Sequence, residues 1–114
     1  MGYDLPEEFQ SKFKLLKQEY IDKLPQMISE LSIAINDFLQ DPTEESIKKA
    51  YTVVHNLSGS SGLYGYSDIS KKSKEFDKII KPFLEKTELP TEENIILVRQ
   101  KFMEYLSFLQ NYNL

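Results

Sequence analysis

The fold is decided first by residues 6–39, which read PEEFQSKFKLLKQEYIDKLPQMISELSIAINDFL. Apolar residues in this stretch recur at steps of three and four, the spacing that places side chains on one face of an α-helix. Pro25 interrupts the stripe, because proline lacks a backbone donor and clashes with the preceding turn. We therefore predict one kinked helix or two consecutive helices here. The apolar stripe consists of Phe9, Phe13, Leu16, Tyr20, Leu24, Met27, Leu31, Ile35 and Phe38.

A second helix is predicted to begin at residues 41–44 and to run to about Gly62. Asp41 is the expected N-cap, Pro42 suits the first helical position, and Glu44 completes a capping box. Helical spacing places one set of residues on the core face of this helix. These residues are Ile47, Ala50, Val54, Leu57 and Ser61.

Two more helices complete the chain. Ser67 is the expected cap of a third helix, which Pro82 bends or ends, and residues 86–90 form a loop. Thr91 is the expected cap of a fourth helix, with a frayed tail at residues 111–114. The predicted inward positions are Ile69, Ser73, Phe76, Ile80 and Phe83 in the third helix and Ile95, Val98, Phe102, Leu106 and Leu109 in the fourth.

These segments predict an all-α fold, since no stretch alternates like a strand. Short connections between the helices favour an antiparallel four-helix bundle with a kinked or split N-terminal helix. A chain of 114 residues is long enough for one core and too short for two domains and a linker, so residues 1–114 are expected to form a single domain.

Composition excludes several classes of function. The net charge of 14 − 18 = −4 has the wrong sign for a protein that neutralises nucleic-acid phosphates. The absence of cysteine excludes thiolate metal sites and cysteine nucleophiles. No apolar run approaches the roughly 20 residues that cross a bilayer. The first residues lack the pattern of a secretory signal, so a cytoplasmic protein without membrane contact is expected.

Residues 54–65, VHNLSGSSGLYG, contain the only histidine of the chain. Helical spacing places His55 well off the core face of the second helix, on an exposed flank. Its neighbours on that flank are predicted to be Lys48, Tyr51, Thr52, Ser58, Gly59 and Gly62.

The glycines of this segment indicate a function other than helix stability. Each glycine inside a helix costs about 1 kcal/mol relative to alanine. Low relief around His55 would let a partner bring a phosphorylated aspartate within bonding distance of the ring. Imidazole suits this task, because its ordinary pKa of about 6.5 leaves much of it neutral and nucleophilic at neutral pH.

This segment resembles the HPt (histidine-containing phosphotransfer) family. The family pattern is histidine, any residue, leucine, lysine, glycine, serine, serine or alanine, three variable residues and glycine. The resemblance also extends to the helical layout, and so covers nearly the whole chain. The positions that match in register are His55, Leu57, Gly59, Ser60, Ser61 and Gly65.

The resemblance implies a phosphoryl carrier in a two-component phosphorelay. His55 would be the phosphoacceptor, and the partners would be receiver domains of response regulators or hybrid histidine kinases. The receiver would supply Mg²⁺, and this chain would need no cofactor of its own. The resemblance further implies a protein without kinase activity of its own. We expect this protein to be a monomer.

The chain departs from the family pattern at Ser58, where relatives carry lysine facing the phosphoryl group. A hydroxyl can donate a hydrogen bond but brings no charge. Lys48, two turns before His55 on the same side, is the nearest candidate for a replacement cation. Lys71, Lys74 and Lys78 recur along the third helix as a solvated face or as candidate docking residues.

Two alternative interpretations stay open. The chain would be a non-catalytic HPt-like module that binds a receiver or kinase, as Ser58 favours, or a purely structural bundle, which leaves His55 and the glycines unexplained. Acidic residues in the first helical turns are explained by the helix dipole, so no metal site is predicted.

Overall fold

The computed structural model describes residues 6–112, which form five α-helices and no strand. Residues 113 and 114 of the predicted frayed tail lie outside the described part. None of the helices in residues 6–112 is long and apolar enough to cross a membrane. The helices are α1 (Glu7–Asp22), α2 (Leu24–Gln40), α3 (Glu44–Leu63), α4 (Ser67–Leu84) and α5 (Glu92–Gln110).

The predicted break in the first helix is confirmed, and it falls at Lys23. Pro25 occupies the first turn of α2, where its missing N–H group costs no intrahelical hydrogen bond. The backbone stays hydrogen-bonded through the break. The Lys23 N–H group donates to the Tyr20 carbonyl (3.1 Å), and the Lys23 carbonyl accepts from the Met27 N–H group (3.0 Å).

The cap of α3 is Thr43, so the prediction of Asp41 as the cap and Glu44 as its partner is wrong. The Thr43 hydroxyl accepts from the Ser46 N–H group (3.1 Å), and the Ser46 hydroxyl oxygen accepts from the Thr43 N–H group (2.9 Å). This reciprocal pair satisfies two N–H groups that would otherwise lack partners. Asp41 instead offers its carbonyl to the Ser46 hydroxyl (2.8 Å).

The ends of α4 and α5 differ in how well the sequence predicted them. Ser67 is the first residue of α4 and not its cap; the cap position belongs to Tyr66, which makes no side-chain capping bond. Pro82 does not end α4, which continues for two more residues. Thr91 caps α5 as predicted, accepting from the Asn94 N–H group at 3.2 Å.

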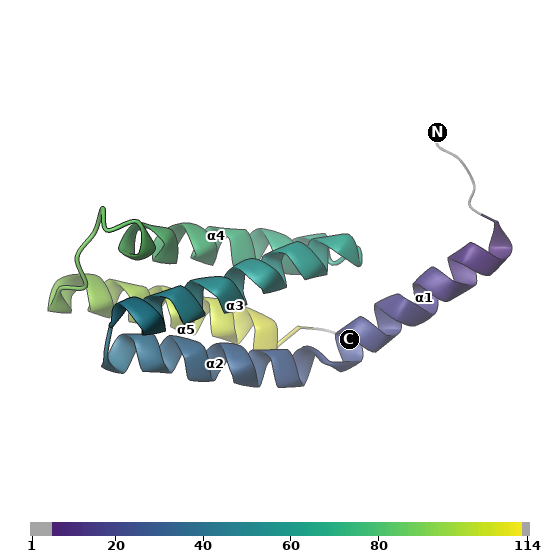
Figure 1. Ribbon diagram of the computed structural model, residues 1–114. Coiled ribbons are helices and arrows are strands. Elements are labelled where there is room, and N and C mark those ends of the chain that lie inside the picture. The colour runs from purple at the N-terminus through teal and green to yellow at the C-terminus, as the bar shows by residue number, and fades with distance from the viewer. Residues whose placement is uncertain (1–5, 113–114) are drawn as a thin grey trace.

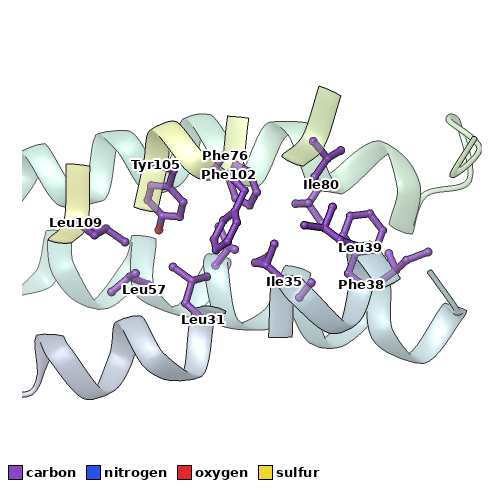
Figure 2. Close-up of a cluster of buried hydrophobic side chains, with 14 of the residues drawn as sticks. Leu31, Ile35, Phe38, Leu39, Leu57, Phe76, Ile80, Phe102, Tyr105 and Leu109 are labelled. Carbon is purple, nitrogen blue, oxygen red and sulfur yellow. The ribbon is translucent and has the colours of Figure 1, made fainter. Parts of the chain in front are cut away.

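Helices α2 to α5 form a helical bundle in which successive helices run in alternate directions (Figure 1). Both α2 and α4 lie beside α3 and α5. The predicted inward faces of α3 and α4 are buried, whereas Ile95 and Leu106 of α5 are only half-buried. Figure 2 shows the centre of the core, where α2, α4 and α5 contribute Leu31, Ile35, Phe38, Phe76, Ile80, Phe102 and Leu109.

Helix α1 extends away from this bundle (Figure 1), and its backbone comes near no helix other than α2. Phe9, Phe13 and Leu16 are therefore exposed and do not belong to the core as the sequence predicted. The helical spacing of the apolar residues continues unchanged along the sequence, but the turn at Lys23 changes the direction of the chain. The stripe thus leaves the bundle at the break.

Small residues bring α3 and α4 close together along a line that we name the α3–α4 seam, formed by Ser58, Ser61, Gly62 and Ser70. A Cβ atom on Gly62 would lie 3.0 Å from the Ser70 hydroxyl oxygen. The Ser70 hydroxyl donates to the Ser58 carbonyl (2.8 Å), and the buried Ser61 hydroxyl donates to the Leu57 carbonyl (2.6 Å). The seam is thus closely packed and its hydroxyl groups have partners.

Substitution of Leu57 tests the orientation of α3. Leu57 is buried, so Leu57→Ala should lower the free energy of unfolding by about 2–5 kcal/mol. Leu63→Ala is the matched control, since Leu63 lies in the same helix and is exposed; it should change stability by less than about 0.5 kcal/mol. Urea denaturation measures both. Equal losses would contradict the assigned core face.

Candidate functional site

His55 lies in the second half of α3, on the flank that faces away from the core. Its side chain is 60% exposed, in agreement with the prediction from helical spacing. The adjacent Val54 and the nearby Leu57 are both buried. The same helix therefore anchors the bundle with one face and presents the imidazole with another.

Two side chains hold the imidazole ring. The ring of Tyr51, one turn earlier in α3, stacks on it with the centroids 5.3 Å apart and an angle of 18° between the planes. Asp77 of α4 reaches the ring edge, with its Oδ2 atom 3.3 Å from Nδ1 of His55. One contact restrains the ring face and the other restrains its rotation.

The contact with Asp77 assigns different roles to the two ring nitrogens. An ionised carboxylate only accepts hydrogen bonds, so Nδ1 must be the atom that carries the proton. In the neutral ring the lone pair then resides on Nε2. Among residues 6–112, Nε2 has no hydrogen-bond partner. The nitrogen without a partner is thus the nucleophilic one.

The Asp77 carboxylate is partly withdrawn from water. Its side chain is 15% exposed, and its Oδ1 atom is buried with no hydrogen-bond partner in the described chain. Behind it lies Tyr105, whose hydroxyl pairs with that of Ser73 at 2.6 Å. Burial raises the pKa of Tyr105, and the negative charge of Asp77 adds to that shift. Tyr105 therefore stays neutral beside the carboxylate.

Sequence analysis missed Asp77. It directly follows the core residue Phe76 and so lies at the edge of the buried face of α4, an unusual place for an acidic side chain. That position was a usable signal of a special role. Its pairing with a histidine 22 residues earlier depends on the spacing of α3 and α4, which no local pattern contains.

The three glycines near His55 have different environments. A Cβ atom on Gly59 would meet nothing within 4 Å, so packing does not require glycine there. Gly62 belongs to the α3–α4 seam, where glycine permits the close approach of Ser70. Gly65 has a φ of 85°, the left-handed region that favours glycine, and forms the turn into α4. Only Gly59 lacks a structural explanation.

Ser58 does not share the exposed flank that the sequence analysis assigned to it. The residue is 4% exposed and faces the seam, because it lies on the side of α3 that turns toward α4. The predicted neighbours Lys48 and Thr52 are exposed, and the Thr52 hydroxyl donates to the Lys48 carbonyl at 2.8 Å. The structure therefore groups His55 with Tyr51, Gly59 and Asp77 more closely than with Ser58.

The three candidate docking lysines lie together. Lys71, Lys74 and Lys78 are exposed and line one hollow between α3 and α4, together with Gly62 and Ser70 of the seam. This hollow adjoins the helical turns that follow His55. Glu75 also lines the hollow, so its lining carries both signs of charge with positive charge in excess.

No group of acidic, histidine or cysteine side chains in residues 6–112 has the arrangement of a metal site. In comparisons with known proteins, the chain matches no protein-family model and no curated protein sequence. Inference about function therefore depends on the motif and on the geometry around His55.

Alanine substitutions at two glycines test their separate roles. Gly59→Ala should raise the free energy of unfolding by up to about 1 kcal/mol, since alanine has a higher helix propensity than glycine and nothing obstructs the new methyl group. Gly62→Ala should melt at a lower temperature than Gly59→Ala, because its methyl group pushes against the Ser70 hydroxyl. Thermal denaturation followed by circular dichroism compares the two. The same melting temperature in both variants would show that the seam is not tight at Gly62.

Proposed function

We propose that this chain is a histidine phosphotransfer protein, which relays a phosphoryl group between receiver-domain aspartates through His55. The observation that carries the proposal is the pairing of Nδ1 with Asp77, which leaves Nε2 exposed and nucleophilic. The HPt-like motif around His55 supports it independently. A buried or hydrogen-bonded Nε2 would have argued against it.

The proposed reaction is a single phosphoryl transfer. Nε2 of the neutral ring attacks phosphorus, an N–P bond forms, and the P–O bond to the donor aspartate breaks, which returns that aspartate as a carboxylate. The ring keeps its proton on Nδ1 and so acquires positive charge. Asp77 lies at the atom where this charge develops, and its partial burial strengthens the attraction. The reverse steps pass the group to a second aspartate.

The surroundings of His55 suit the approach of a receiver domain. Gly59 leaves open space one turn beyond the ring, where a side chain would obstruct the incoming phosphoaspartate. Lys71, Lys74 and Lys78 line the hollow beside Gly62, and their positive charge complements the acidic pocket of a receiver. The receiver supplies Mg²⁺ and the acidic pocket, and this chain supplies an aligned imidazole. It has no kinase activity of its own.

The fold fits this role in a specific form. In this proposal α2 to α5 constitute an antiparallel four-helix bundle, and α1 is an extension of it. Rigid helices are suitable carriers of a reactive side chain, because they hold it in one orientation without a loop that must close. A relay between receiver domains takes place in the cytoplasm, where we place the protein.

A non-catalytic binding module is the second candidate. Ser58 occupies the position at which HPt proteins carry a lysine, and it is buried in the seam. The Ser58 hydroxyl carries no charge and faces the seam, so it does not neutralise a phosphoryl group on His55. In that case the chain would bind a receiver or kinase through the same surface without accepting phosphate.

Labelling of the parent and of His55→Gln distinguishes these two functions. Incubation with a phosphorylated receiver should place an acid-labile, base-stable label on the parent and none on the variant. The variant should stay folded, since the His55–Asp77 pair is partly exposed and contributes about 1 kcal/mol or less. An unlabelled parent that still binds the receiver would favour the binding module. Label on the variant would place the acceptor elsewhere.

Substitution of Asp77 tests the role assigned to it as a positioning residue. Asp77→Ala should slow phosphoryl transfer roughly tenfold or more, because a charge-assisted hydrogen bond of about 1.5–3 kcal/mol is lost. Asp77→Glu should restore part of the rate. Glu85→Ala is the matched control, since Glu85 is an exposed acid at the end of the same helix. Rapid-quench labelling measures the three rates; equal slowing by Asp77→Ala and by the control would refute the assignment.

A further inference from the structure

An apolar stripe on α1 is left without a partner. We name Phe9, Phe13 and Leu16 the α1 stripe; their exposed fractions are 55%, 45% and 47%. None of the three packs against the bundle core. They lie one turn apart on one face of α1 and so form a continuous apolar surface. Such a surface on a projecting helix indicates an interface with another molecule.

The opposite end of α1 is held firmly. The Tyr20 hydroxyl bonds to the Ser60 hydroxyl (2.7 Å), and the Tyr20 ring stacks on that of Tyr64 with centroids 4.8 Å apart. The Lys17 ammonium lies 4.9 Å from the centroid of the Tyr66 ring. These contacts fix the direction of α1 but leave its first turns outside the bundle. An unsupported helix of this length is marginal in water, so these turns need a partner.

The charges beside the stripe identify that partner. Lys12 and Glu19 are seven residues apart, and so lie on the same flank of the stripe. Glu8 continues that flank toward the start of α1, so the signs along it run negative, positive and negative. In a second copy of α1 that runs in the opposite direction, the charges of this flank occur in the reverse order. Lys12 of each copy then faces Glu19 of the other.

We infer that the α1 stripe pairs antiparallel with α1 of a second copy of this chain, which forms a two-fold symmetric dimer. In this arrangement Phe13 packs against Leu16 of the second copy, and Lys12 faces Glu19 of the second copy. A two-fold axis repeats both contacts, as an isologous interface requires. A parallel pair is disfavoured, because it brings Lys12 beside Lys17 of the second copy and the two positive charges repel each other.

This inference replaces the monomer expected from the sequence, and it does not depend on phosphotransfer. The apolar contact is small, so dimerisation should be reversible and dependent on concentration. The bundle itself is not part of the contact. His55 therefore stays exposed in both copies.

The first experiment measures mass as a function of concentration for the parent chain by sedimentation equilibrium. The mass should rise from that of the 13.4 kDa monomer toward twice that value. The double variant Phe13→Ser/Leu16→Ser should stay monomeric at every concentration while its bundle melts as the parent does. Leu15→Ser is the matched control, since Leu15 is 59% exposed on another face of α1; it should dimerise as the parent does.

A charge exchange tests the direction of pairing. Lys12→Glu should weaken dimerisation several-fold, and Lys12→Glu/Glu19→Lys should restore it, because the exchanged charges again face opposite signs. A parallel pair predicts the reverse for Lys12→Glu, which would then strengthen dimerisation by pairing with Lys17. A monomeric parent, dimerisation of the stripe variant, or loss of dimerisation in Leu15→Ser would each overturn the inference.

Discussion

The close approach of α3 and α4 is the constraint on which the rest of the structure depends. A Cβ atom on Gly62 would lie 3.0 Å from the Ser70 hydroxyl oxygen, closer than an ordinary contact, and that hydroxyl bonds to the Ser58 carbonyl. The distance between the helices is therefore set by residues that have little or no side chain. This distance also determines how closely side chains of α3 and α4 approach each other, including those of His55 and Asp77.

The candidate site belongs to neither helix alone. Helix α3 contributes the imidazole and the aromatic ring that stacks on it, and α4 contributes the carboxylate that orients it. Because both groups are attached to helices that pack on a common core, the orientation exists before any partner arrives. Charge that develops on the ring then meets a carboxylate already in place, and little reorganisation is needed. Stability of the core and alignment of the site are two results of the same packing.

Local periodicity was sufficient to predict the helices and most of their buried faces. The repeat of the α-helix fixes which side of α3 carries Val54 and which carries His55, whatever the neighbours are. Three features were not predictable in this way. The direction of α1 after Lys23, the burial of Ser58 against α4, and the contribution of Asp77 all depend on how one helix is placed relative to another. Sequence spacing describes a single helix and contains no information on that placement.

The break at Lys23 makes α1 a rigid arm and not a flexible linker. Backbone hydrogen bonds continue on both sides of the break, so the angle between α1 and α2 is well defined. Tyr20 joins this arm to the bundle, because its hydroxyl hydrogen-bonds to that of Ser60, which lies five residues after His55 in α3. The arm that projects into solvent is thus joined to the end of the helix that carries the imidazole, through the Tyr20–Ser60 hydroxyl pair and the stacking of Tyr20 on Tyr64.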